Sequence, residues 1–276
     1  MKTILTIAGF DPSSGAGITA DLAVIAAHGF FGISAITALT VQSTLGVSGV
    51  HPVGGALLDA TLLCLVEDLP PAGVKIGMLG SRENVLIVVN FLHRLRASGW
   101  STPVVLDPVI RSSSGGEMLS RAGLDLLRTE LLPLVDWVTP NVAELGAIVG
   151  MEVRDSAAME LAVERLMAGH PALNVVATGG HLDSANDLVA RNDGQRRWLR
   201  AEKIVSRATH GTGCAHSTAL TCNLVAGTDP LQSARHAKDY VAGAIRRAEV
   251  IGNGNGPMDL LWPLRQGRPA GDYRRL

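Results

Sequence analysis

Cysteine is scarce in this sequence of 276 residues, and neither sign of charge is in clear excess. The three cysteines, Cys64, Cys214 and Cys222, have neither metal-ligand spacing nor the even number of a disulfide framework, which favours a reducing, cytoplasmic location. The formal net charge is -1, so electrostatics gives no reason to expect nucleic acid or an anionic membrane surface as a partner.

Long uninterrupted apolar runs are missing as well. Asp11 and Pro12 interrupt the apolar start of the chain before a signal-peptide core could form. No stretch is long enough to span a bilayer without a charge or a proline. We therefore expect a soluble protein that is not exported.

Two familiar phosphate-binding signatures are absent from the glycine-rich segment 9–17. The segment lacks the Gly-Lys-Ser/Thr ending of a P-loop, and its glycines do not have the spacing of a dinucleotide fingerprint. A nucleotide site of either of those two kinds is not expected here.

What the sequence does contain is apolar, with 47% hydrophobic and 18% charged residues. A sizeable core can form and disorder is not expected. Short apolar runs alternate with helical patterns, which predicts an α/β fold with a mainly parallel central sheet and helices on both faces. The expected strands are 4–8, 33–40, 74–79, 104–106, 137–138, 174–177, 187–192 and 197–204, the last two joined by a hairpin at 193–194; the expected helices are 18–28, 54–68, 84–96 and 215–226.

The chain shows no linker-like segment and no internal repeat, so we expect a single domain over residues 1–262. The remaining residues, 263–276, are locally basic and are expected to form a flexible tail. In open sheets of this class, ligands collect at the carboxyl ends of the strands. Seven residues stand at or just past such ends: Gly9, Gln42, Met78, Asp107, Asn141, Thr178 and Gly211.

The stretch from Gly211 to Gly227 contains no charged residue and begins with Gly-Thr-Gly-Cys. It predicts a buried helix whose first N–H groups suit a phosphate. Cys214 would lie in the positive field of that helix terminus, which lowers the pKa of a thiol and makes it a better base. The same residues also fit a plain buried helix in which the cysteine only packs.

The blocks at 8–21, 37–40, 75–79, 106–109, 139–144, 179–181 and 209–214 resemble, in order and in sequence, the hydroxymethylpyrimidine and phosphomethylpyrimidine kinases of thiamine biosynthesis. The resemblance implies a three-layer ribokinase-like fold. It also implies transfer of the γ-phosphoryl group of ATP to the hydroxymethyl group of 4-amino-5-hydroxymethyl-2-methylpyrimidine, and in a second round to its monophosphate. Mg²⁺ as a cofactor and a homodimer are further implications.

In the catalytic block of that family, a loop of backbone amides holds the transferring group. The resemblance gives this role to Gly211, Thr212 and Gly213, and makes Cys214 the base that receives the proton of the alcohol. Most of the catalytic effect is expected from positioning and from charge stabilisation by those amides.

The substrate-binding positions of the family also have counterparts. The resemblance implies that Asp21 and Gln42 hydrogen-bond the amino group and ring nitrogens of the pyrimidine. The backbone of Gly9 would add a contact, and Met78 and Val109 would form apolar walls. Taken singly, each of these residues also has a plain structural explanation, as a helix-end acid, a turn residue or a core side chain.

The nucleotide and metal positions come from the same resemblance. Asn141, Thr178 and Gly180 are expected at the nucleotide, and Glu144, in the pattern Asn-x-x-Glu, is expected to bind Mg²⁺ through water. Asp107 is a second candidate near the metal. Oxygen ligands and retained waters are what Mg²⁺ prefers.

The sequence departs from the family at several points. Thr178 stands where a lysine is common, which weakens the case for a substrate that already carries a phosphate. Arg111 is a candidate to replace the lost cation. His216 follows the cysteine closely and either tunes the pKa of Cys214 or packs. Neither His181 nor His210 has a second ligand at metal spacing, so no metal is expected there.

Three other functions remain open from the sequence. Pyridoxal kinase is the nearest, because pyridoxal has a similar ring with a hydroxymethyl group. A pyrimidine sensor without catalysis is opposed by the presence of both Glu144 and Cys214. A cysteine hydrolase lacks an acyl site with a positioned histidine.

Overall fold

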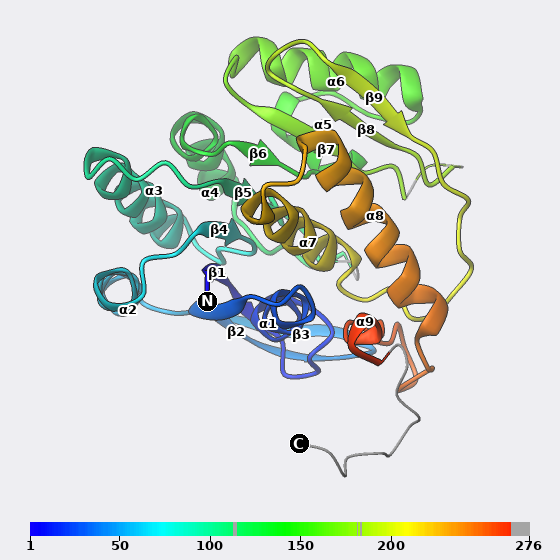
Figure 1. The fold of residues 1–276 in the computed structure, drawn as a ribbon, viewed down its shortest axis with the longest axis horizontal. Helices are drawn as coiled ribbons and strands as arrows, with labels where there is room; N and C mark the ends of the chain where they lie inside the picture. The colour runs from blue at the N-terminus through cyan, green and yellow to red at the C-terminus, as the bar shows by residue number, and fades with distance from the viewer. Residues whose placement is uncertain (113–114, 181, 183, 266–276) are drawn as a thin grey trace.

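The computed structural model describes residues 1–112, 115–180, 182 and 184–265, and within these the strands form one nine-stranded sheet (Figure 1). The order across the sheet is β3-β2-β1-β4-β5-β6-β7-β8-β9. The strands from β2 to β7 are parallel, and β3, β8 and β9 are antiparallel to their neighbours, so the expected mainly parallel sheet is confirmed. The strands are β1 Thr3–Phe10, β2 Phe31–Ser43, β3 Gly46–Pro52, β4 Gly73–Ile76, β5 Val104–Leu106, β6 Trp137–Val138, β7 Asn174–Ala177, β8 Asp187–Ala190 and β9 Arg196–Leu199.

Helices cover both faces of the sheet, as expected (Figure 1). One layer contains α1 Gly17–Ala27, α7 Thr212–Ala226, α8 Pro230–Arg247 and the short α9 Trp262–Arg265. The other contains α2 Gly55–Asp68, α3 Arg82–Ala97, α4 Arg121–Leu126, a π-helical turn Leu127–Leu131, a 3-10 turn Leu132–Leu134, α5 Val142–Val149 and α6 Ser156–Gly169. None of the helices in the described residues is sufficiently long and apolar to cross a membrane.

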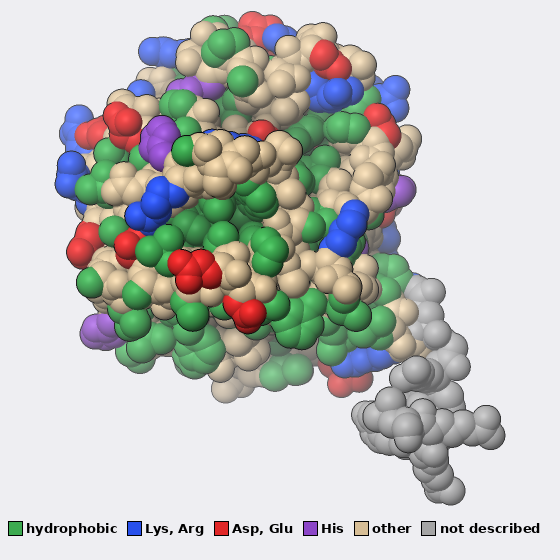
Figure 2. Space-filling model, turned by 60° about the vertical axis from the view of Figure 1, so that its left-hand side comes forward, with side chains coloured by type: hydrophobic (Ala, Val, Ile, Leu, Met, Phe, Trp, Pro, Cys, Tyr) green, Lys and Arg blue, Asp and Glu red, His purple; other side chains and the backbone are tan. Residues whose placement is uncertain are grey.

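Strand residues alternate between the two cores that these layers enclose. In β5, Val104 and Leu106 pack with α3 and α5, whereas Val105 packs with α1, α7 and α8. The period of two along a strand produces this division. The outer surface is mixed in charge: on the face in Figure 2, Lys, Arg, Asp and Glu side chains are scattered among apolar ones.

Three differences from the sequence prediction lie at the edges of the fold. The strand β3, which contains two glycines, was not expected, and it forms by antiparallel pairing with β2. The last strand ends at Leu199, not at 204, although the hairpin between β8 and β9 is present. The expected tail begins within α9, and its residues 266–276 lie outside the described residues.

A buried ion pair ties the layer of α1 and α7 to the sheet. Lys75 in β4 is 0% exposed, and its Nζ lies 2.8 Å from Asp21 Oδ2 of α1. The same carboxylate accepts hydrogen bonds from Thr6 of β1 at 2.6 Å and from Thr218 of α7 at 2.8 Å. Burial alone would lower the pKa of Lys75, but Asp21 in contact with it, and then Cys214 and Asp107, raise it above its ordinary value.

Replacing Lys75 with Met should destabilise the protein by about 3–5 kcal/mol, because it leaves the Asp21 carboxylate buried without its counter-ion. Urea unfolding followed by circular dichroism measures the change. The double variant Lys75→Met/Asp21→Asn should lose less than the sum of the two single variants, since neither charge is then left alone.

Arg196→Met is a matched control, because Arg196 pairs with Glu164 at the surface, where ion pairs contribute about 0–1 kcal/mol. An unfolding free energy of Lys75→Met equal to that of the control would show that the buried pair does not hold α1 to the sheet.

Candidate active site

The helix α7 begins at the carboxyl ends of the strands, after Gly211 in a left-handed conformation with φ of 77°. The first hydrogen bond of the helix runs from the Ala215 N–H to the Gly211 carbonyl, so the N–H groups of Thr212, Gly213 and Cys214 lie ahead of it. The helix ends at Gly227, also left-handed, as the sequence predicts. This terminus is chemically suited to an anion.

The glycines of this loop permit close packing between two loops. A Cβ atom on Gly211 would collide with the Gly15 carbonyl, and a Cβ on Gly15 would collide with the His210 ring. The loop after β1 and the loop before α7 are therefore in direct contact.

The expected low pKa of Cys214 is wrong. Protein atoms pack densely around its sulfur, and this burial raises the pKa of the thiol to about 12. Lys75 acts in the opposite direction, but the carboxylates of Asp107 and Asp21 add to the increase. Burial and the neighbouring carboxylates thus act on the thiol in the direction opposite to the field of the helix terminus.

Asp107 lies directly against the start of α7. Its carboxylate accepts a hydrogen bond from Ser217 at 3.2 Å, interacts with the Cys214 thiol, and would be 3.8 Å from a Cβ atom on Gly213. Burial raises the pKa of Asp107, although Lys75 lowers it in part. The Cys214 thiol and the Asp107 carboxylate thus form a hydrogen-bonded pair.

Asn141 and Glu144 form a capping box at the start of α5. The Asn141 side chain accepts hydrogen bonds from the N–H groups of Ala143 and Glu144, and Glu144 accepts one from the Asn141 N–H at 2.9 Å. Burial, and then the nearby Asp107 carboxylate, raise the pKa of Glu144 to about 8. The pattern Asn-x-x-Glu therefore caps the first turn of α5.

The Asp107 carboxylate is near enough to Glu144 to raise the pKa of that carboxyl group, and both residues are buried. Among the described residues, no group of three or more His, Cys, Asp or Glu side chains could hold a metal ion. Two carboxylates suit a Mg²⁺ ion whose remaining ligands are water and phosphate, because Mg²⁺ retains several waters in proteins. The donor set therefore fits that ion.

The expected apolar walls come together. Met78 packs with Ala38 and Met118, and Val109 packs against this group. A Cβ atom on Gly9 would meet the terminal methyl group of Met78, so the Gly9 backbone and the Met78 side chain are in close contact. Residues distant in the sequence thus form one apolar surface at the carboxyl ends of β1, β2 and β4.

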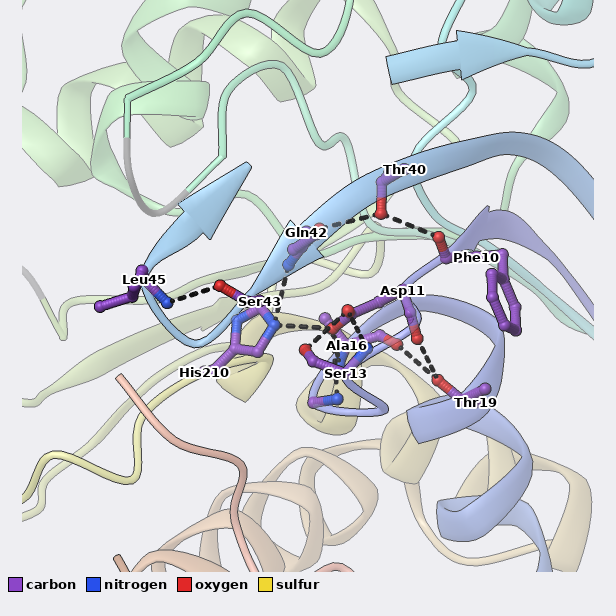
Figure 3. Close-up of polar contacts among 11 residues, drawn as sticks. Phe10, Asp11, Ser13, Ala16, Thr19, Thr40, Gln42, Ser43, Leu45 and His210 are labelled. Atoms are coloured by element: carbon purple, nitrogen blue, oxygen red, sulfur yellow. Dashed lines mark hydrogen bonds and ion pairs between the residues drawn. The ribbon is translucent and has the colours of Figure 1, made fainter. Parts of the chain in front are cut away.

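Gln42 belongs to a hydrogen-bonded group shown in Figure 3. Its amide nitrogen lies 2.9 Å from His210 Nε2, and the same ring nitrogen lies 2.7 Å from Asp11 Oδ2. Thr40 contacts the amide oxygen of Gln42 at 3.2 Å. Gln42 is half-buried, so part of it remains accessible to a ligand.

Asp21 does not fit its expected part as a ligand of the pyrimidine. Its residue is 0% exposed, and both carboxylate oxygens are engaged by Thr6, Lys75 and Thr218. The acid anchors α1 beneath the site, and the charge it was expected to present to a ligand is neutralised by Lys75.

The expected nucleotide residues lie on neighbouring strand ends. Asn141 and Thr178 form an isolated bridge, and the Thr178 N–H donates to the Pro140 carbonyl at 2.9 Å. Gly180 is exposed on the loop that follows β7, and a Cβ atom there would meet nothing within 4 Å. His181, beside it, lies outside the described residues.

His216 and Arg111 have surroundings of their own. The buried ring of His216 is influenced by Asp187 and Lys238, and burial lowers its pKa. Cys214 is not tuned by it, since the charges acting on the thiol are Lys75, Asp107 and Asp21. Arg111 is exposed, and its backbone bridges to Glu117.

Three further residues shape the site, and sequence reasoning gave them no role in it: Lys75, Asp11 and His210. A lysine inside an apolar strand was a usable signal, because lysine is almost never fully buried without a partner. No comparable signal marked the contact of Asp11 with His210, since 199 positions separate them.

Comparison with known proteins agrees with this arrangement. A family model described as phosphomethylpyrimidine kinase matches residues 11–259. The chain is 41% identical over 263 residues to the hydroxymethylpyrimidine/phosphomethylpyrimidine kinase of Haemophilus influenzae, and the match covers 93% of this chain and 96% of that protein.

Solved structures show the same fold. An ADP complex of Bacillus subtilis pyridoxal kinase superposes with a TM-score of 0.85 at 28% identity, covering 96% of this chain and 99% of the other. Phosphomethylpyrimidine kinase from Clostridium difficile 630 gives a TM-score of 0.77 at 33% identity, covering 89% and 100%. This chain, with its ribokinase-like fold, therefore belongs to the phosphomethylpyrimidine kinase family and is a phosphotransferase.

Proposed function

We propose that the protein transfers the γ-phosphoryl group of ATP to the hydroxymethyl group of 4-amino-5-hydroxymethyl-2-methylpyrimidine, as a step of thiamine biosynthesis. The observation that carries the proposal is the convergence at one sheet edge of the amide-rich start of α7, the Cys214–Asp107 pair and the apolar surface of Gly9, Met78 and Val109. An aromatic alcohol on that surface would direct its hydroxyl group toward the start of the helix.

The backbone amides of Thr212, Gly213 and Cys214 stabilise the negative charge of the transferring phosphoryl group, and this is the largest catalytic contribution. The proton of the alcohol passes to the Cys214 sulfur while the proton of the thiol moves to Asp107. Since the pKa of Asp107 is itself raised, the carboxylate is a competent acceptor.

Asn141, Thr178 and Gly180 bind the nucleotide, and Glu144 and Asp107 would hold Mg²⁺, an ion that prefers oxygen ligands and retains water. When bound, the ion neutralises charge on the phosphates. The two buried carboxylates require such a cation to be ionised together.

The first phosphorylation is the main reaction in this proposal. Thr178 supplies no cation for a substrate that already carries a phosphate, and Arg111, exposed near the site, is the residue that would have to replace it. Pyridoxal is the second candidate substrate, because a pyridoxal kinase matches the fold closely.

We also place the protein in the cytoplasm, because its three cysteines are free thiols, which persist in a reducing compartment.

A homodimer is carried over from the resemblance. The exposed Leu39 and Val41 of β2 offer an apolar surface for such contact, and sedimentation of the L39K/V41K variant as a smaller species than the unmodified protein would support it.

The experiment that tests the function is a coupled ATP-consumption assay with the pyrimidine alcohol, its monophosphate and pyridoxal. We expect kcat/KM to be highest for the pyrimidine alcohol. Its monophosphate should be a poorer substrate, because the uncharged Thr178 offers no cation to the phosphate. Turnover of pyridoxal alone would reverse the order of the two candidates. Binding of the alcohol without any phosphate transfer under saturating Mg-ATP would instead indicate a sensor.

Cys214→Ala should lower kcat on the order of 10²–10⁴-fold while leaving ATP binding nearly unchanged, because it removes the proton acceptor but not the amides. Cys214→Asp should retain more activity than Cys214→Ala. In the unmodified protein kcat should fall as pH is lowered, because Asp107, whose pKa is raised by burial, must be ionised to receive the thiol proton. Equal kinetics for the unmodified protein and Cys214→Ala would remove the base assignment.

Binding of Mg-nucleotide should release a proton at pH 7 and much less at pH 9.5. Glu144 has a pKa of about 8, so it is mostly protonated at pH 7 and must ionise to hold the cation. Calorimetry in two buffers of different ionisation enthalpy measures the release. The Glu144→Gln variant should not release this proton. The Glu130→Gln variant, in which an exposed glutamate is replaced, is the control and should release it as the unmodified protein does. Identical proton release in the two variants would exclude Glu144 from the metal site.

A further inference from the structure

Three segments distant in the sequence meet at one histidine nitrogen. His210 precedes α7 and is 8% exposed, Asp11 follows β1, and Gln42 lies near the end of β2 (Figure 3). The Nε2 atom of His210 lies 2.7 Å from Asp11 Oδ2 and 2.9 Å from the Gln42 amide nitrogen. An imidazole nitrogen carries at most one hydrogen, so these two contacts constrain each other.

The Asp11 side of this contact decides where the hydrogen lies. Its carboxylate already accepts hydrogen bonds from the N–H and hydroxyl of Ser13 and from the N–H groups of Gly15 and Ala16. Burial alone would raise the pKa of Asp11, but the hydrogen bonds from His210 and Ser13 outweigh it and lower that pKa. An ionised carboxylate is only an acceptor, so the Nε2 atom of His210 must be the donor.

The Gln42 side then follows from a count of hydrogens. The Thr40 hydroxyl has one hydrogen, and it lies 3.0 Å from the Phe10 carbonyl as well as 3.2 Å from the Gln42 amide oxygen. If the carboxamide of Gln42 turns by 180°, its oxygen shares with Asp11 the one hydrogen of His210 Nε2, and its nitrogen donates to Thr40, which in turn donates to Phe10. No donor then faces another donor, as the amide nitrogen and the His210 Nε2–H do in the opposite orientation, and one N–H of Gln42 is left without a protein acceptor among the described residues.

We infer that His210 is a positioning residue that fixes the carboxamide orientation of Gln42, so that Gln42 offers its remaining N–H to the substrate ring. The inference rests on the proposed function, because it takes Gln42 as the residue that recognises the ring. In the antiparallel ladder Gln42 is opposite Val47, which packs against the apolar group of Ala38, Met78 and Met118. The Gln42 side chain therefore lies on the same side of the ladder as the apolar walls.

The ligand class that this arrangement selects is an aromatic ring with an unprotonated ring nitrogen. Such a nitrogen accepts the hydrogen of Gln42, whereas a C–H at the same position leaves that donor unpaired. His210 is also the residue next to Gly211, so the segment that orients the ring and the segment that binds the phosphoryl group are continuous.

The first test reads the hydrogen directly and needs no enzymatic activity. Long-range ¹⁵N–¹H correlation spectra of the full-length protein should show that the Nε2 atom of His210 is protonated. The signal is assigned by its loss in His210→Leu or, should that variant not fold, by its shift in Gln42→Ala. A neutral ring with hydrogen only on Nδ1 would overturn the inference.

The second test is a double-mutant cycle. His210→Leu should lower kcat/KM for the pyrimidine alcohol on the order of tenfold or more, mainly through KM, with the KM for ATP unchanged. In the Gln42→Ala background the same substitution should cost less than about threefold. A loss of equal size in both backgrounds would show that His210 does not act through Gln42 and would overturn the inference.

Substrate analogues complete the cycle. Two analogues are compared, each with one of the two ring nitrogens replaced by C–H. In the unmodified protein kcat/KM should be about tenfold lower for one analogue than for the other, and in His210→Leu the two values should be similar. His28→Leu is the control, because His28, a partly buried histidine at the end of α1, contacts the Val24 carbonyl and the Tyr240 ring and none of the residues in Figure 3 that bond His210. Absence of turnover with every alcohol would refute the proposed function, while the ring spectrum would still decide the role of His210.

Discussion

One buried ammonium group, that of Lys75, is the constraint on which the rest of the site depends. Its charge acts on Asp21, Cys214 and Asp107, which come from three different elements. Acidic groups packed together in a medium of low dielectric constant cannot all ionise without a counter-ion. Lys75 thus fixes the docking of α1 and α7 on the sheet and, at the same time, the charge available at the catalytic end.

Much of the fold could be predicted because its signals are local. Apolar runs ending in glycine or proline gave the parallel strands, and the uncharged stretch between Gly211 and Gly227 gave α7 with both its ends. The strand β3 could not be found in this way, since a segment with two glycines becomes a strand only by pairing with β2. The end of β9 was misjudged for the same reason, because the partner strand β8 determines how far the pairing extends.

The hydrogen-bond partners and charge surroundings of the site residues were harder to predict than their places in the fold. The apolar contact of Gly9 with Met78 agrees with the sequence interpretation. The binding partners of Asp21 and the raised pKa of Cys214 did not follow from their local patterns. Lys75 and Thr218 bind the carboxylate of Asp21, and burial together with Asp107 raises the pKa of Cys214. Charge environments of this kind arise from residues 50 to 200 positions apart, and a motif contains no information about them.

The contact between the two glycine loops limits how this enzyme can diversify. Because Gly211 touches the Gly15 carbonyl and Gly15 touches the His210 ring, neither loop can gain a side chain without displacing the other. Met78 and Val109 instead pack in the apolar group of Ala38 and Met118. Substitution of those two wall residues would therefore be the simpler way to change which ring the site prefers. A substitution at Gly15 or Gly211 would need a compensating change in the other loop.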